Sequence, residues 1–254
     1  MYGRGTQGPP IRFGPPITPP IVKQLLIANA VVFLAQALLR GIDEYGAIRP
    51  VLVWQGLCLW QPFTYMWLHG SLGHAAMNMF VLWMFGSQLA LLWGPRRFLR
   101  YYLVCGVGAG VLIASYPYLL VWLGLTSPLQ LRIPTVGASG AVYGIVLAYS
   151  LTWPDRTIML IFPPVAFRAI WIIPVMFFTT VLFGGGNVSH IGHLGGVVVG
   201  WLYLRQRGEA GRMPSIGELR SRWRRYRMRR RLRAVRSGEW EEERRRREEK
   251  RTYH

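Results

Sequence analysis

Three long stretches of the chain carry apolar residues and no charge. No Asp, Glu, Lys or Arg occurs at positions 50–95, 101–131 or 169–204. A helix needs about 20 mainly apolar residues to cross the hydrocarbon core of a bilayer, and each stretch is long enough for one or more such helices. The pattern therefore predicts an all-α, polytopic membrane protein built as a bundle of six transmembrane helices. The predicted spans cover residues 21–39, 74–94, 98–118, 137–152, 168–184 and 188–205.

Residues 50–73 are also apolar, but they are rich in tryptophan, which favours the membrane interface. A seventh span here would move Arg96, Arg97 and Arg100 to the outside, whereas short basic loops normally stay in the cytoplasm. We therefore expect an interfacial, partly re-entrant loop. With six spans, both termini are predicted to be cytoplasmic.

The composition of the chain indicates three regions. The chain has 254 residues, 52% of them hydrophobic, and a formal net charge of +19. Residues 1–20 form a Pro/Gly-rich arm that we expect to be disordered, and 21–205 form the membrane domain. Residues 206–254 form an Arg-rich tail, predicted to be cytoplasmic and to contact anionic lipid headgroups, where each cation near the surface contributes about 1 kcal/mol. Nucleic-acid binding by this tail is the less favoured alternative.

Four polar side chains fall inside the apolar runs. Ser139 opens the fourth span, His193 lies near the start of the sixth, and His74 and Asn78 lie on one face of the second because they are four residues apart. Polar groups at membrane depth are costly, so they are functional candidates. The alternative is that they only hydrogen-bond neighbouring helices. His69 lies off that face and is expected to be a structural loop residue.

These side chains have the chemistry of serine catalysis. A serine hydroxyl becomes a good nucleophile when an adjacent base takes its proton, which here assigns Ser139 as nucleophile and His193 as general base. The oxyanion formed by the attack needs donors, and the Ser139 backbone N–H, the His74 ring and the Asn78 amide could supply them. His190 competes for the role of base.

Glycines follow both members of the predicted pair. Gly140 and Gly144 follow the serine, and Gly196 and Gly200 follow the histidine, each pair at a four-residue spacing that lets helix backbones approach closely. Close contact of the fourth and sixth spans would bring hydroxyl and imidazole together. The alternative is that both patterns serve packing alone. The glycine pattern after His193 is also the reason for preferring it to His190.

The familiar catalytic triad has a carboxylate behind its histidine, and this chain has none to offer. Before the tail, the only acids are Asp43, Glu44 and Asp155, none within a predicted span at the required level. We therefore expect a dyad whose His193 is oriented by packing, with Tyr143 as the neighbouring ring. The same lack of acids disfavours an aspartyl protease, and no His-Glu-x-x-His motif indicates zinc. No metal or cofactor is predicted.

Three motifs resemble the rhomboid family of intramembrane serine proteases. The resemblance covers roughly residues 21–205 and implies the same dyad and oxyanion donors, with Tyr143 stacking on the base. The first loop departs from the family, because Trp60-Gln61 replaces the frequent Trp-Arg pair, which puts the usual hydrogen bonds of that loop in doubt. The motifs are His69-Gly-Ser-Leu-Gly-His74-Ala-Ala-Met-Asn78, Gly137-Ala-Ser139-Gly140-Ala-Val-Tyr143-Gly144 and His193-Leu-Gly-Gly196-Val-Val-Val-Gly200.

The resemblance implies an endopeptidase that cleaves transmembrane segments of single-pass membrane proteins near the outer membrane surface. The compact six-span layout suggests a bacterial inner membrane. Two alternatives remain open: a catalytically silent relative that only binds membrane proteins, and a small-solute transporter. A transporter would need a continuous polar path, whereas the polar residues here gather near one face.

Overall fold

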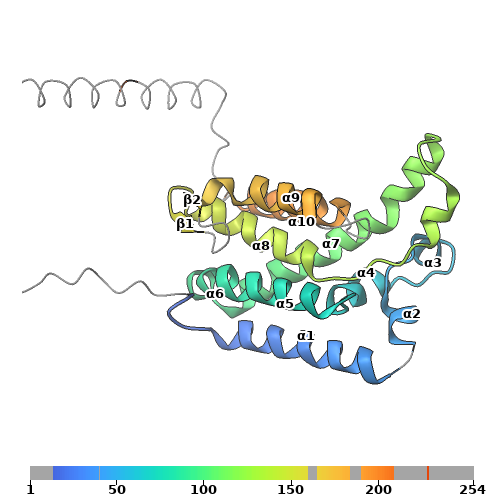
Figure 1. Cartoon of the computed structure of the whole chain (residues 1–254), viewed down its shortest axis with the longest axis horizontal. Coiled ribbons are helices and arrows are strands. Elements are labelled where there is room, and N and C mark those ends of the chain that lie inside the picture. The colour runs from blue at the N-terminus through green and yellow to red at the C-terminus, as the bar shows by residue number, and fades with distance from the viewer. Residues whose placement is uncertain (1–13, 40, 160–164, 184–189, 209–227, 229–254) are drawn as a thin grey trace, which may run out of the picture. The chain divides into compact units, whose positions relative to one another are not determined.

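The computed structural model describes residues 14–39, 41–159, 165–183, 190–208 and Met228. Within these ranges the chain is mostly helical with almost no sheet (Figure 1), so the predicted helical membrane bundle is confirmed. The helices are α1 (Pro20–Leu38), α2 (Ile42–Gly46), α3 (Pro50–Trp54), α4 (Gln61–Thr64), α5 (Leu72–Val81), α6 (Ser87–Trp93), α7 (Pro95–Trp122), α8 (Ser139–Thr152), α9 (Ile172–Phe183) and α10 (His190–Gln206). Short 3₁₀ or π turns cover Tyr65–Trp67, Leu82–Gly86, Pro128–Arg132 and Ala169–Trp171.

The six predicted spans correspond to α1, the α5–α6 unit, α7, α8, α9 and α10. Three of these are long and apolar enough to cross a membrane by themselves: Pro20–Leu38, Leu72–Trp93 and Pro95–Trp122. The helices of the later spans are shorter. The second span runs from α5 into α6 through the π turn and ends at Gly94, whose φ of 77° reverses the chain before Pro95 begins α7. This reversal lies between the second and third predicted spans.

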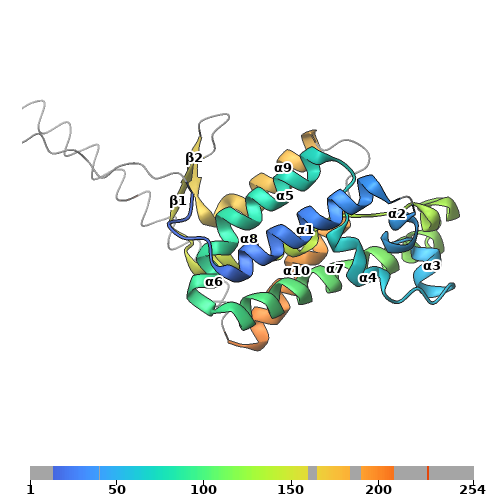
Figure 2. The same ribbon diagram turned by 90° about the horizontal axis from the view of Figure 1, so that it is seen from below.

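Helix α1 shows how the bundle meets lipid. Val22, Leu25 and Asn29 are buried, whereas its other face exposes large apolar side chains such as Val31 and Leu34. A contiguous apolar surface of this kind is unfavourable in water. It is the surface expected of a helix at the lipid-facing edge of a membrane bundle (Figure 2).

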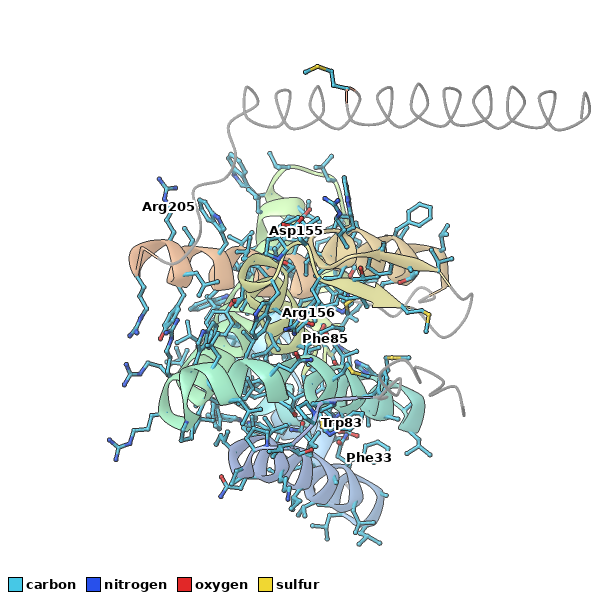
Figure 3. The ribbon with its side chains drawn as sticks, turned by 90° about the vertical axis from the view of Figure 1, so that its left-hand side faces the viewer. Phe33, Trp83, Phe85, Asp155, Arg156 and Arg205 are labelled. Carbon is cyan, nitrogen blue, oxygen red and sulfur yellow. The ribbon has the colours of Figure 1, made fainter. Side chains whose placement is uncertain are left out.

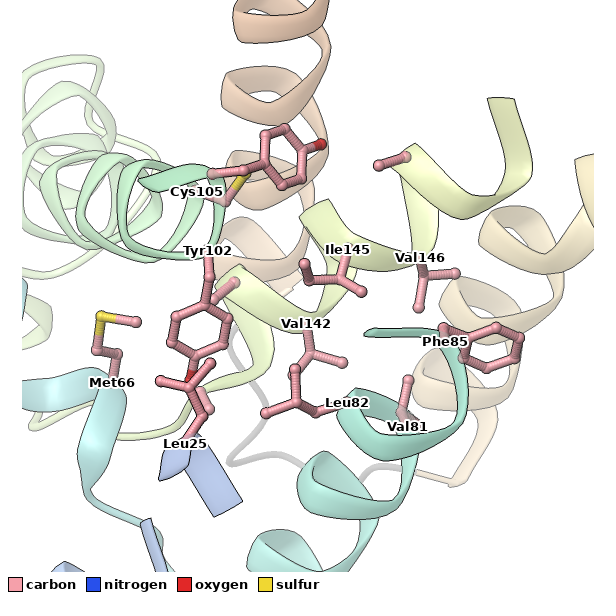
Figure 4. Close-up of a cluster of buried hydrophobic side chains, with 14 of the residues drawn as sticks. Leu25, Met66, Val81, Leu82, Phe85, Tyr102, Cys105, Val142, Ile145 and Val146 are labelled. Carbon is pink, nitrogen blue, oxygen red and sulfur yellow. The ribbon is translucent and has the colours of Figure 1, made fainter. Parts of the chain in front are cut away.

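Helices α7, α8 and α10 pack against one another at the centre of the bundle. Every residue of α8 from Gly140 to Ser150 is buried, as expected for a helix surrounded by protein on all sides. Figure 4 shows the apolar cluster in which Val142 and Ile145 of α8 meet Tyr102 of α7 and Leu82 of the second span. The candidate serine begins this central helix.

The first loop, residues 41–71, contains only short helices, so the structure agrees with the loop predicted at 50–73. Gln61, which is only 1% exposed, holds this loop together through hydrogen bonds of its side-chain amide. The Gln61 Oε1 atom accepts from the backbone N–H of Arg49 at 3.0 Å, and Nε2 donates to the Tyr45 carbonyl at 3.4 Å. The departure from Trp-Arg therefore leaves the loop with hydrogen bonds of its own, made by the glutamine.

A small hairpin between α8 and α9 was not predicted. Strand β1 (Thr157–Met159) pairs antiparallel with β2 (Ala166–Arg168). Beside it, the Arg168 side chain donates to Asp155 at 3.3 Å, and the Arg156 guanidinium lies over the Trp153 ring. Figure 3 shows where Asp155 and Arg156 lie. The hairpin delays the fifth helix, which begins at Ile172 instead of residue 168. Sequence reasoning missed it because each strand has only three residues.

The last residues of the N-terminal arm contact the second span. Residues 1–13 lie outside the described ranges, but Thr18 accepts a hydrogen bond from the Trp83 indole at 2.8 Å, and Gly14 lies against the same ring. The arm expected to be disordered over 1–20 is thus tied to the second span by its last residues.

Candidate active site

Ser139 is the first residue of α8, and the loop before it is held in place by Gly137. The Gly137 φ of +134° is a conformation that side-chain-bearing residues rarely adopt. Its N–H donates to the Tyr65 carbonyl at 2.9 Å, which ties the loop to the turn that follows α4. Ser139 itself is half-buried. As a first helical residue, it has a backbone N–H without a partner inside the helix.

The His74 ring lies against the same glycine. A Cβ placed on Gly137 would come within 2.9 Å of His74 Nε2 and 3.8 Å of Ser139 Oγ, so the imidazole and the hydroxyl both border this position. His74 is held there by Ser71, whose side chain caps α5 by accepting from the His74 backbone N–H at 3.2 Å. Gly137 is required both for its backbone conformation and for the room it leaves.

Asn78 lies one turn further along α5 and is 6% exposed. Its Nδ2 donates to the His74 carbonyl at 3.0 Å. An amide nitrogen carries two hydrogens, so one remains for another acceptor. The predicted sharing of one helix face by His74 and Asn78 is consistent with this contact.

His69 is buried behind His74, with ring centroids 5.2 Å apart. The Gln36 side chain of α1 binds both backbone groups of His69, accepting from its N–H at 3.0 Å and donating to its carbonyl at 3.2 Å. Burial, with a smaller contribution from His74, lowers the pKa of His69 to about 4, and the Trp67 backbone partly opposes this. His69 is therefore a neutral, structural residue, as expected.

His193 lies on α10, is 6% exposed, and packs flat on Tyr143 of α8. The ring centroids are 4.3 Å apart and the planes differ by 10°. Among the described residues, no group hydrogen-bonds to His193 Nδ1. The imidazole is thus oriented by ring packing. His190 lies 6.5 Å from His193 in an edge-on arrangement and does not share the stack.

The glycines bring α8 and α10 into backbone contact. A Cβ on Gly196 would overlap the Gly140 carbonyl group, and a Cβ on Gly144 would lie 3.3 Å from the Gly196 carbonyl oxygen. Gly200 packs against Tyr101, where a Cβ would meet the phenol oxygen at 2.5 Å. Close packing of the fourth and sixth spans was the central structural prediction, and this geometry agrees with it.

Sequence reasoning missed Thr180 on α9, whose hydroxyl lies 3.0 Å from the Tyr143 hydroxyl. The available signal was a polar side chain inside an uncharged apolar span. Within the described ranges, no group of three or more His, Cys, Asp or Glu has the geometry to hold a metal ion.

Comparison with known proteins places these residues in a family. A family model, the Rhomboid domain, matches residues 57–207. The chain is 31% identical to "Rhomboid protein 1, mitochondrial" of Saccharomyces cerevisiae over 142 residues, 53% of this chain and 38% of that protein. It is 31% identical to "Presenilin-associated rhomboid-like protein, mitochondrial" of Mus musculus over 194 residues, 72% of this chain and 47% of that protein. It is 30% identical to "RHOMBOID-like protein 12, mitochondrial" of Arabidopsis thaliana over 208 residues, 73% and 59% of the two chains.

These relatives correct one expectation. All three are mitochondrial proteins, which overturns the predicted bacterial inner membrane, whereas the membrane-protein assignment stands. The chain spans about half the length of the curated relatives it matches. The family model covers more than half of this chain, including all three motifs and the helices that carry them, and the chain therefore belongs to the rhomboid family.

Proposed function

We propose that this chain is an intramembrane serine endopeptidase that uses a Ser139–His193 dyad. Membership of the rhomboid family supports intramembrane proteolysis in general. The observation that carries the finer assignment is the Tyr143 ring stacked on His193. Tyr143 lies one helical turn after Ser139, so the ring that orients the imidazole is carried by the helix that carries the nucleophile.

In the proposed reaction, His193 accepts the Ser139 proton as the hydroxyl attacks the scissile carbonyl carbon. The C–O bond forms and the carbonyl becomes an oxyanion. The oxyanion then collapses to an ester as the C–N bond breaks, and the imidazolium protonates the leaving amine. Water attacks the resulting ester and gives its proton to His193. The ester bond to Ser139 then breaks, the imidazolium returns the proton to the serine oxygen, and the acid is released. The stacked Tyr143 ring holds the imidazole in one orientation through these proton transfers.

The oxyanion is proposed to bind at the N-terminus of α8. The free N–H of Ser139 points out of the first turn, and the positive end of the helix dipole favours an anion there. The His74 ring lies on the same side of Gly137 as the Ser139 hydroxyl, and Asn78 keeps one N–H available. Loss of one such donor typically lowers the rate by about 10²–10³.

The depth of Ser139 supports a transmembrane substrate. Helix α8 has 14 residues and is about 21 Å long, less than the roughly 30 Å of hydrocarbon it would have to cross. Its other end carries Trp153 under Arg156, a pair typical of the membrane interface. Ser139 is then below the opposite surface. We propose that substrates are transmembrane segments that unwind locally, because a continuous helix keeps its carbonyls in its own hydrogen bonds.

Labelling with a serine-directed fluorophosphonate, together with cleavage of a model transmembrane substrate in detergent, tests the proposal. Wild type should label and cleave, whereas Ser139→Ala and His193→Ala should do neither while unfolding at a similar temperature. Ser150→Ala is the matched control, since Ser150 is a buried serine of the same helix that hydrogen-bonds the Leu147 carbonyl. This control should label like wild type. A folded wild type that never labels at Ser139 would favour the silent-relative alternative.

The other proposed partners are anionic lipid headgroups, and most of the tail that would bind them lies outside the described ranges. The tail at 206–254 is described only at residues 206–208 and Met228. Its binding to anionic lipid headgroups, in preference to nucleic acid, stays a prediction from its arginine content.

A further inference from the structure

The hydroxyl groups of Tyr143 and Thr180 are hydrogen-bonded at 3.0 Å, joining α8 to α9. The direction of this bond can be worked out. The Thr180 hydroxyl also lies 2.7 Å from the Met176 carbonyl, which can only accept. Because a hydroxyl has a single hydrogen, Thr180 donates to Met176 and accepts from Tyr143. The Tyr143 O–H is thus directed at one oxygen of α9.

This bond fixes the ring that orients the candidate base. Tyr143 holds His193 through its face and is itself held at its tip by Thr180. His193 has no hydrogen-bond partner at Nδ1 among the described residues, so nothing else polar restrains the imidazole on that side. If the Tyr143 ring could tilt, the orientation of the stacked His193 imidazole would change with it.

Helix α9 touches the same histidine by a second route. The Phe177 ring meets His190 edge-on at 5.9 Å, and His190 in turn meets His193 at 6.5 Å. Phe177 and Thr180 are three residues apart, so they lie on one face of α9. That face therefore supports His193 both through α8 and through α10.

We infer that Thr180 is a positioning residue for the base, acting through Tyr143, so that the geometry of His193 depends on α9 being seated against α8. This inference rests on the proposed protease function. Loss of one hydrogen bond between membrane helices typically changes an equilibrium constant or a rate by a factor of about 3 to 15. Loss of the bond should lower kcat within that range and leave KM unchanged, because the substrate does not touch Thr180 in this scheme.

The chain offers a matched set of variants. Thr180→Val keeps the shape and removes the acceptor, and Thr180→Ser keeps the hydroxyl. Thr179→Val is the control, because Thr179 is exposed on the same helix and donates only to the Met176 carbonyl at 2.9 Å. We expect kcat on a model transmembrane substrate to fall in Thr180→Val, to recover in Thr180→Ser, and to equal wild type in Thr179→Val.

A double-mutant cycle with Tyr143→Phe locates the effect. If Thr180 acts only through the tyrosine hydroxyl, the combined variant should be no slower than Tyr143→Phe alone. Full additivity of the two losses, a wild-type kcat in Thr180→Val, or an equal loss in Thr179→Val would each overturn the inference.

A spectroscopic readout separates this inference from the proposed function. The Hε1 resonance of His193 in protein with labelled histidine senses the ring current of the stacked Tyr143. We expect Thr180→Val to shift it and Thr179→Val to leave it in place. An unmoved His193 resonance in Thr180→Val refutes the positioning role, whereas a wild type that neither labels nor cleaves refutes the protease.

Discussion

The contact between Gly140 and Gly196 leads to the sharpest structural prediction. In Gly196→Ala, the new methyl carbon would overlap the Gly140 carbonyl oxygen and lie 2.6 Å from the carbonyl carbon and 3.0 Å from its Cα. Carbon atoms in contact normally lie about 3.5–4.0 Å apart, and these neighbours are backbone atoms that no rotamer change can move. Helices α8 and α10 would therefore have to separate by at least about 1 Å. Since Ser139 and His193 lie on these two helices, their reacting atoms would move apart by a similar amount.

The expected cost follows from that displacement. A misplacement of about 1 Å can lower the rate by about 10²-fold, and overpacking a tight interface typically costs about 1–3 kcal/mol. We therefore expect Gly196→Ala to lose about two orders of magnitude in substrate cleavage and to unfold at a lower temperature in detergent.

The control is Gly73→Ala, on α5. No atom lies within 4 Å of a Cβ at this position, and alanine is the better helix former by about 1 kcal/mol. This variant should unfold at the same temperature as wild type or slightly higher. A Gly196→Ala protein with wild-type activity and unfolding temperature would show that the two helices are not pressed together as described, and the reasoning for the dyad would fail with it.

Two further predictions concern the first loop and its neighbourhood. Gln61→Leu leaves the Arg49 N–H without its partner and removes one of the two hydrogen bonds to the Tyr45 carbonyl, which keeps the one from the Trp60 indole. It should destabilise the protein by about 1–3 kcal/mol in thermal unfolding, while the exposed Gln55→Leu should not. The pKa of His69 is lowered from 6.5 to about 4 in the folded chain. Between pH 6.5 and pH 4, His69 is therefore protonated in the unfolded chain but not in the folded chain. Stability should therefore fall as pH drops from 6.5 towards 4, by about 3 kcal/mol at most. His69→Phe should flatten that part of the pH profile, and an unchanged slope would contradict this assignment.

Much of the architecture could be read from the chain because the bilayer imposes simple rules. Charge-free stretches marked the helices to within a few residues, since a membrane span tolerates few charges. The polar residues Ser139, His74 and His193 stood out for the same reason, and their position at one end of the predicted helices followed from the order of the spans.

Other features were decided only in three dimensions, because they depend on which helices become neighbours. Replacing arginine by Gln61 put the hydrogen bonds of the first loop in doubt, yet its buried amide bonds the Arg49 N–H and the Tyr45 carbonyl. No local sequence pattern predicts these partners. Thr180 lies 37 positions from Tyr143, and its hydroxyl could have bonded its own helix alone. The glycine spacing allowed close approach of two helices, but only the packed bundle determined that Gly196 would meet Gly140, because a small residue permits a contact without choosing its partner.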